Sequence, residues 1–236
     1  MPPTLDFSRF QWLSFDCYGT LIDWETGILG YLRPLLQSKG CAVSDAQILS
    51  LYSEFEPREQ AGHYRSYREV LGSVVRAFAR ELHFQVTDRE AYGLAESIRG
   101  WQPFADTVAG LHRLHSRYKL AILSNIDDDL FASTAPKLEA PFDAVVTAQR
   151  VHSYKPSLNN FEALLRRYDI PREHLLHIAE SLYHDVVPAH SLEIATVWVN
   201  RRQGRDAAAT RLVAAQPDLE VRDIGALAEL LTESRA

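Results

Sequence analysis

The sequence predicts an α/β fold, a doubly wound parallel sheet with a helical cap domain inserted after its first strand. Two observations predict it. Short apolar runs alternate with polar turns and segments of helical period, which is typical of parallel strands joined by helices on both faces of a sheet. A long block near the start breaks this alternation and has helical period alone. With 236 residues and 46% hydrophobic content, the chain can bury one core and a small inserted module.

Five apolar runs are the expected strands, and the first of them is expected in the middle of the sheet. Between them, apolar residues recur at helical spacing, for example Phe161, Leu164 and Tyr168 behind Ser157. The expected strands are 11–15 (QWLSF), 119–123 (KLAIL), 142–147 (FDAVVT), 175–179 (LLHIA) and 195–199 (ATVWV).

The inserted block is expected to form four helices over the carboxyl end of the first strand. Pro34 should bend or end the first of these helices, because proline cannot donate the helical hydrogen bond. The second opens at Ser44 with Gln47 three residues later, the spacing of a capping box. The core domain is therefore expected at residues 1–22 and 101–236, and the cap domain at residues 23–100.

Charge and cysteine content argue against several kinds of partner. Lys and Arg total 25 against 31 Asp and Glu, and this net charge of -6 does not suit a nucleic-acid groove or an anionic membrane surface. No apolar stretch approaches the length of a membrane span, and the first residues do not resemble a secretory signal. Two cysteines make a disulfide framework unexpected, so we expect a cytoplasmic location. The sequence leaves open whether the chain forms a homodimer.

Polar residues close the expected strands, at the edge where open parallel sheets bind their ligands. A carboxylate held there in a dry site can attack an electrophilic centre and divide a hydrolysis into ester formation and ester hydrolysis. An ammonium beside two carboxylates would keep the attacking one ionised, and hydroxyl groups could donate to substrate oxygens or to the ester carbonyl. The residues that supply these groups are Asp16, Thr20, Ser124, Asn125, Lys155 and Asp185.

In their chain order, the segments FDCYGTLID, LSNID, HSYKPS and AESLYHD resemble the four motifs of the haloacid dehalogenase superfamily. Within it, the pattern D-x-Y-G-T-L is similar to the L-2-haloacid dehalogenases (type II). The resemblance implies a Rossmann-like core with an inserted cap. It also implies hydrolysis of the carbon-halogen bond of short 2-haloalkanoic acids through an ester on Asp16, without a metal or other cofactor. It assigns catalysis to Asp16, Thr20, Ser124, Lys155 and Asp185, and contacts with a small anionic substrate to Tyr18, Asn125, Glu180 and Ser181.

Several departures from the dehalogenase pattern keep a second interpretation open. The resemblance implies an arginine on the second cap helix to hold the halide, but residues 46–56 contain none, and Arg58, Arg65 and Arg68 are the nearest candidates. Leu182 and Phe161 also replace the asparagine and tyrosine of that family.

Glu180, with Asp185, resembles the acidic pair that holds magnesium in superfamily phosphatases, so the alternative is a magnesium-dependent phosphatase of a small phosphate ester. Tyr18 argues against a phosphatase, because this tyrosine stands where superfamily phosphatases have a second aspartate that protonates the leaving group of a phosphate ester. A third possibility is a binding or regulatory protein that keeps the fold without turnover.

Overall fold

A computed structural model describes residues 5–202, 208–210 and 213–233 of the chain. Its centre is a parallel sheet in the order β3-β2-β1-β4-β5-β6, which confirms the predicted fold class. β1 pairs with β2 on one side and with β4 on the other, so the first strand lies inside the sheet as expected. The strands are β1 (Trp12–Phe15), β2 (Lys119–Ser124), β3 (Ala144–Thr147), β4 (Leu175–Ala179), β5 (Ala195–Val199) and β6 (Leu219–Val221).

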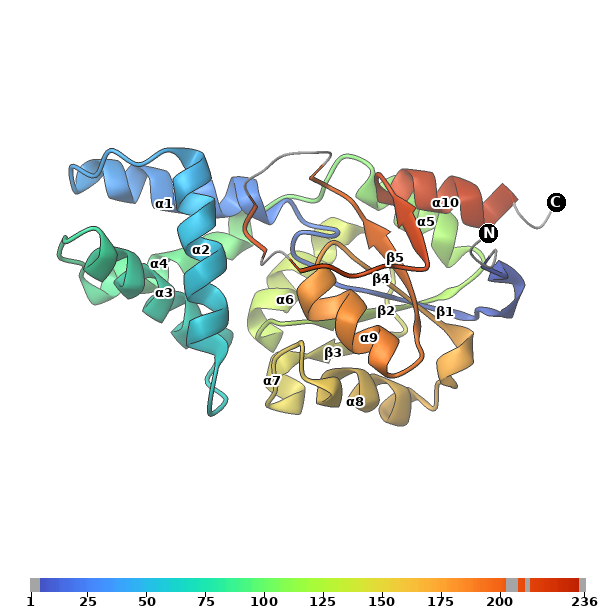
Figure 1. The fold of residues 1–236 in the computed structure, drawn as a ribbon. Helices are drawn as coiled ribbons and strands as arrows, with labels where there is room; N and C mark the ends of the chain where they lie inside the picture. The colour runs from blue at the N-terminus through green and yellow to red at the C-terminus, as the bar shows by residue number, and fades with distance from the viewer. Residues whose placement is uncertain (1–4, 203–207, 211–212, 234–236) are drawn as a thin grey trace.

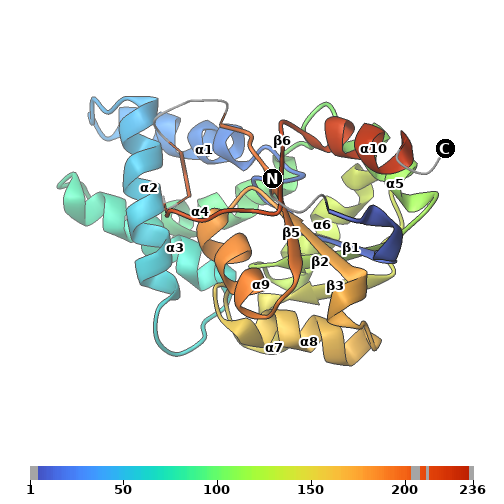
Figure 2. The same cartoon turned by 45° about the vertical axis from the view of Figure 1, so that its right-hand side comes forward.

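Helices cover both faces of the sheet (Figures 1 and 2). On one face, α5 (Thr107–His115) packs against α10 (Ile224–Glu233). On the other face lie α8 (Leu158–Tyr168) and α9 (Val187–Ser191). Alternating residues of β1 enter the two cores: Leu13 and Phe15 enter the first, and Trp12 enters the second beside Phe161 of α8. The remaining core helices are α6 (Asp128–Thr134) and α7 (Ala148–Val151).

Four helices follow β1 and stand apart from the sheet, at the left of Figure 1. They are α1 (Trp24–Ser38), α2 (Asp45–Gln60), α3 (Tyr67–Glu81) and α4 (Asp88–Ser97). The predicted capping box is present, since the Ser44 side chain accepts from the Gln47 backbone and the Gln47 side chain accepts from the Ser44 backbone. The described part of the chain contains no helix that is both long and apolar enough to cross a membrane.

Pro34 does not end the first cap helix, because α1 continues through it to Ser38, and the expected bend stays a prediction. Pro34 is exposed, so water can satisfy the backbone carbonyl that loses its helical donor. Leu32, Leu35 and Leu36 on either side are buried, and their packing holds the helix together across the proline.

The chain enters and leaves the cap at neighbouring points. The Asp23 amide donates to the Gln102 carbonyl at 2.9 Å, and the Phe104 amide donates to the Leu21 carbonyl at 3.0 Å. These contacts tie the two linkers together, and the domain boundaries at 22 and 101 remain our prediction.

A second junction lies at the N-terminus of α3. There the Asp127 carboxylate of the core accepts the backbone amides of Tyr67 at 2.9 Å and Arg68 at 3.0 Å. The side chain of this aspartate caps a cap-domain helix from the core, which holds the two parts of the molecule together.

Candidate active site

A cleft lies where the carboxyl ends of the central strands meet the cap. Its empty volume of about 390 Å³ includes open solvent, so the enclosed part of the cleft is smaller than this figure. The core contributes Asp16, Tyr18, Ser124, Asn125, Lys155, Ser181, His184, Asp185 and Thr210, and the cap contributes Trp24, Glu56 and Tyr67.

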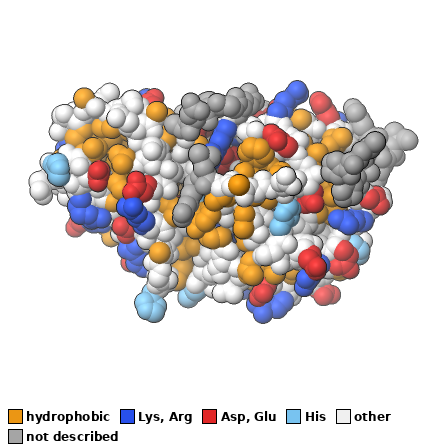
Figure 3. Space-filling model, viewed as in Figure 1, with side chains coloured by type: hydrophobic (Ala, Val, Ile, Leu, Met, Phe, Trp, Pro, Cys, Tyr) orange, Lys and Arg blue, Asp and Glu red, His pale blue; other side chains and the backbone are white. Residues whose placement is uncertain are grey.

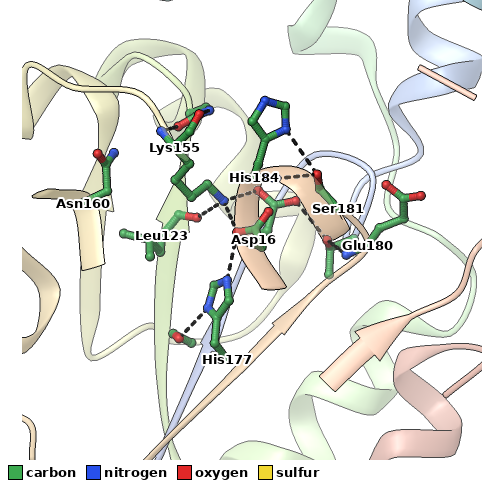
Figure 4. Close-up of polar contacts among 12 residues, drawn as sticks. Asp16, Leu123, Lys155, Asn160, His177, Glu180, Ser181 and His184 are labelled. Carbon is green, nitrogen blue, oxygen red and sulfur yellow. Dashed lines mark hydrogen bonds and ion pairs between the residues drawn. The ribbon is translucent and has the colours of Figure 1, made fainter. Parts of the chain in front are cut away.

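An ammonium between two carboxylates forms the floor of the cleft (Figure 4). The Lys155 Nζ donates to Asp16 Oδ1 at 3.0 Å, to Asp185 Oδ1 at 2.5 Å and to the Leu123 carbonyl at 2.9 Å. These three contacts use all the protons of the ammonium. Lys155 is 1% exposed and Asp16 8%, so the pair is shielded from solvent at the point where three strands end. The structure thus brings together the groups that the sequence placed on separate strands.

Burial and charge act against each other in this cluster. Burial raises the pKa of Asp16, and Lys155 offsets this only in part. Burial would also raise the pKa of Asp185, but Lys155 and a hydrogen bond from His177 lower it below its usual value. Burial alone would lower the pKa of Lys155, yet the two carboxylates raise it. The lysine is therefore a fixed cation, and the ionised form of Asp16 depends on it.

Thr20 and Asn125 hold Asp16 and Lys155 in place, and Asn125 also lines the cleft. The buried Thr20 hydroxyl donates to Asp16 Oδ2 at 2.9 Å and fixes the second carboxylate oxygen. Asn125 binds the backbone of Lys155 through both ends of its amide, at 2.7 and 3.0 Å, and so positions the loop that carries the lysine. Ser124 lines the cleft, and the described residues offer its hydroxyl no hydrogen-bond partner.

Glu180 is not among the described residues that line the cleft, and its contact with substrate stays a prediction. Its Oε1 accepts from Arg202 Nε at 2.9 Å, and its Oε2 accepts from the Thr210 hydroxyl at 2.9 Å. Arg202 and Thr210 lie in the segment after β5, which sequence reasoning did not connect with this carboxylate. Each oxygen of Glu180 therefore already accepts one hydrogen bond, and a magnesium ion beside Asp185 would have to share this carboxylate with Arg202 and Thr210.

The two other expected substrate contacts do line the cleft, although each is tied to a protein partner. The Tyr18 hydroxyl is 2.8 Å from the Thr134 hydroxyl, which directs the phenol toward α6. The Ser181 hydroxyl accepts from the His184 amide and lies 3.2 Å from His184 Nδ1. Burial lowers the pKa of His184 to about 4, so its imidazole is neutral at neutral pH.

Sequence reasoning missed His177, which lies on β4 below the floor of the cleft (Figure 4). One ring nitrogen, Nε2, is 2.8 Å from Asp185 Oδ1, and the other, Nδ1, is 2.8 Å from the Ser14 hydroxyl. Asp185 is thereby held from two sides, by Lys155 and by this imidazole. A polar residue inside the apolar run LLHIA was the signal that could have revealed it.

The arginines expected to hold a halide lie elsewhere. Arg58 pairs with Glu54, and Arg65 pairs with Glu59. Arg68 pairs with Glu96 and Asp129. None of the three is among the residues that line the cleft. In the described lining, the second cap helix instead contributes the carboxyl group of Glu56.

The capped, doubly wound sheet and the acid-lysine-acid cluster at its strand ends define a hydrolase with an α/β core and a cleft between core and cap. The chain belongs to the haloacid dehalogenase-like hydrolases, whose family profile matches residues 10–191. It is 22% identical over 229 residues to an (S)-2-haloacid dehalogenase of Pseudomonas putida, covering 96% of this chain and 98% of that protein.

Two solved structures show the same fold. The L-2-haloacid dehalogenase from Xanthobacter autotrophicus superposes with a TM-score of 0.79 at 18% identity, covering 96% of this chain and 100% of that one. An HAD-hydrolase from Bacillus subtilis bound to magnesium superposes with a TM-score of 0.78 at 17% identity, covering 95% and 99% of the two chains.

Proposed function

We propose that this hydrolase displaces the halogen of short 2-haloalkanoic acids, with the Asp16 carboxylate as the nucleophile. The observation that carries the proposal is the position of that carboxylate at the floor of the cleft, held at Oδ1 by Lys155 and at Oδ2 by Thr20. Both contacts fix its direction toward a substrate carbon above it. The likeness to (S)-2-haloacid dehalogenases over nearly the whole chain supports the same reaction.

In the first step, one Asp16 oxygen forms a bond to the halogen-bearing carbon, and the halide leaves with the bonding electron pair. In the second step, water adds to the carbonyl of the resulting ester, and the bond between that carbonyl carbon and the substrate oxygen breaks. Asp16 is restored, and the 2-hydroxy acid leaves. The Thr20 hydroxyl donates to an ester oxygen, and Lys155 stabilises the negative charge that develops there.

Neutral hydrogen-bond donors would bind the substrate carboxylate, because all three protons of the Lys155 ammonium are already donated to protein oxygens. Ser124 lines the cleft with a hydroxyl that has no partner among the described residues, and the buried Nε2 of His184 has none either. Both groups can donate without adding a second cation to the site.

The test is a single turnover in heavy-oxygen water with enzyme in excess over (S)-2-chloropropionate. Since water attacks the ester carbonyl, the label should enter Asp16, as mass spectrometry of its peptide would show, and should be absent from the first product hydroxyl. Label found directly in the lactate would refute the ester mechanism.

A parallel screen of halide and phosphate release, with magnesium and with a chelator, tests the second interpretation. Chelator-sensitive phosphate release without halide release from any haloacid would replace this proposal with a phosphatase.

A further inference from the structure

A carboxyl group of the cap lines the same cleft as Asp16 of the core. Glu56 lies in the last turns of α2 in the cap, is 4% exposed and borders the same cleft as the core carboxylates. The resemblance to the dehalogenases implies an arginine on this helix, but residues 46–56 contain none. The second cap helix therefore presents a carboxyl group to the cleft, where the dehalogenase pattern would present a permanently charged arginine.

The hydrogen bonds of Glu56 show which of its oxygens is available. Its Oε1 accepts from the Tyr67 hydroxyl at 3.3 Å and from Gln60 Nε2. Both hydrogen bonds that the described residues give to this carboxyl group end on Oε1, and none ends on Oε2. When Glu56 is neutral, its proton therefore resides on Oε2, because Oε1 already accepts from two donors.

The surroundings favour the neutral form of Glu56 below about pH 7. Burial raises its pKa to about 7, the hydrogen bond from Tyr67 opposes this, and the negative charge of Asp16 adds to it. The groups that face it are the phenols of Tyr52, Tyr67 and Tyr154 and the core cluster of Asp16, Lys155 and Asp185. Burial raises the pKa of all three phenols, so they stay neutral. Lys155 is the single Lys or Arg in the described lining, and its protons are already engaged.

We propose that Glu56 is the general acid of this enzyme, donating the proton on Oε2 to fluoride as it leaves, so that short 2-fluoroalkanoic acids are its substrate class. The inference rests on the proposed function above. An in-line displacement directs the leaving group away from Asp16, hence toward the cap wall where Glu56 lies. Among the halides, fluoride is the strongest base and the strongest hydrogen-bond acceptor, so it gains most from a donated proton.

The step balances without a further reactant. Asp16 forms the carbon-oxygen bond, the carbon-fluorine bond breaks with its electron pair on fluorine, and the Glu56 proton passes to that fluoride. Water then hydrolyses the ester, which restores Asp16 and releases one proton. Glu56 regains a proton from solvent before the next turnover.

The experiment compares fluoride release from (S)-2-fluoropropionate with chloride release from (S)-2-chloropropionate, as kcat/KM from pH 5.5 to 9. Glu56→Gln keeps the shape of the side chain and an acceptor for Tyr67 but cannot give up a proton. It should lower kcat/KM for the fluoro acid about 100-fold and for the chloro acid less than about 10-fold. In the wild type, kcat/KM for the fluoro acid should fall as pH rises through about 7, and this fall should be absent in Glu56→Gln. The matched control is Glu54→Gln, an exposed residue of the same helix, which should leave both rates unchanged.

Equal losses on both substrates, or a wild-type pH profile that Glu56→Gln retains, would overturn the general acid but leave the dehalogenase proposal intact. No halide release from either acid would overturn both. Tyr67→Phe gives an independent measurement should Glu56→Gln fail to fold. It removes a hydrogen bond that lowers the pKa of Glu56, so the fall in fluoride release should move to higher pH, and an unmoved profile would count against the role of Glu56.

Discussion

Replacing Lys155 with methionine should destabilise the protein in a way that depends on pH. The lysine is 1% exposed and donates to Asp16, to Asp185 and to the Leu123 carbonyl. Methionine fills nearly the same volume, so the change removes a charge without opening a large cavity. Breaking a buried ion pair from one side costs about 3–5 kcal/mol, because the partner stays buried without compensation. We expect a loss of about 3 kcal/mol at pH 7.5, which would lower the urea midpoint by roughly 1 M.

The loss should shrink on acidification. Lys155 lowers the pKa of both carboxyl groups, so without it both should lie above the unfolded value of about 3.9. The folded variant then binds more protons than the unfolded chain between about pH 4 and the raised pKa values, and its stability falls as pH rises through that window. Since one pKa unit corresponds to about 1.4 kcal/mol, the deficit at pH 5 should be smaller by at least about 1 kcal/mol.

Urea unfolding of the wild type and the variant at pH 5 and pH 7.5 measures both effects. Lys119→Met is the matched control, because this lysine is an exposed residue of β2 that lies 5.0 Å from the ring of Trp12. It should cost less than about 1 kcal/mol at either pH. A Lys155→Met variant as stable as the wild type at pH 7.5, or a deficit that is equal at the two pH values, would refute the electrostatic account of the cluster.

Three further predictions concern other parts of the molecule. Asp16→Asn should abolish halide release yet leave the unfolding midpoint equal to or above that of the wild type, because burial disfavours the charged form; a large loss of stability would contradict this. Asp127→Asn should lower stability by about 1 kcal/mol and speed proteolysis between cap and core, since the N-terminus of α3 loses a charged acceptor; unchanged protease sensitivity would count against that contact. Gly27→Ala should lower the melting temperature, because the added Cβ would lie 2.4 Å from the Trp101 ring, whereas Gly30→Ala on the same helix meets no atom within 4 Å and should not; equal effects in calorimetry would be the contrary result.

The sequence predicted the sheet and the core of the site because both depend on local signals. Each strand is an apolar run, and parallel strands bring their carboxyl ends to one edge whatever the length of the connections. The prediction that Asp16, Ser124, Lys155 and Asp185 meet in one cleft is therefore confirmed. β6 was not predicted, because it has three residues, of which one is buried.

Other features depend on contacts between distant segments, and no local pattern reveals them. The direction of Glu180 is set by Arg202 and Thr210 from the segment beyond β5. Whether Glu56 faces the cleft depends on how α2 lies over the core, which the sequence of that helix does not state. In both cases, the sequence shows the glutamate but does not show which distant residues contact it.

The order in which the site residues are synthesised differs from the order in which they can assemble. β1 and Asp16 are made first, but Lys155 follows 139 residues later, and the neighbouring strands β2 and β4 lie beyond the cap. At about 5–20 residues per second, the ribosome needs roughly 10 s or more to add the lysine. The four cap helices are synthesised before either strand that pairs with β1. During synthesis, the cap can therefore fold through contacts among its own helices while β1 has no partner strand. The ion cluster at the floor of the cleft can form only after Asp185 is made, so its assembly shows that β1 has paired with β2 and β4.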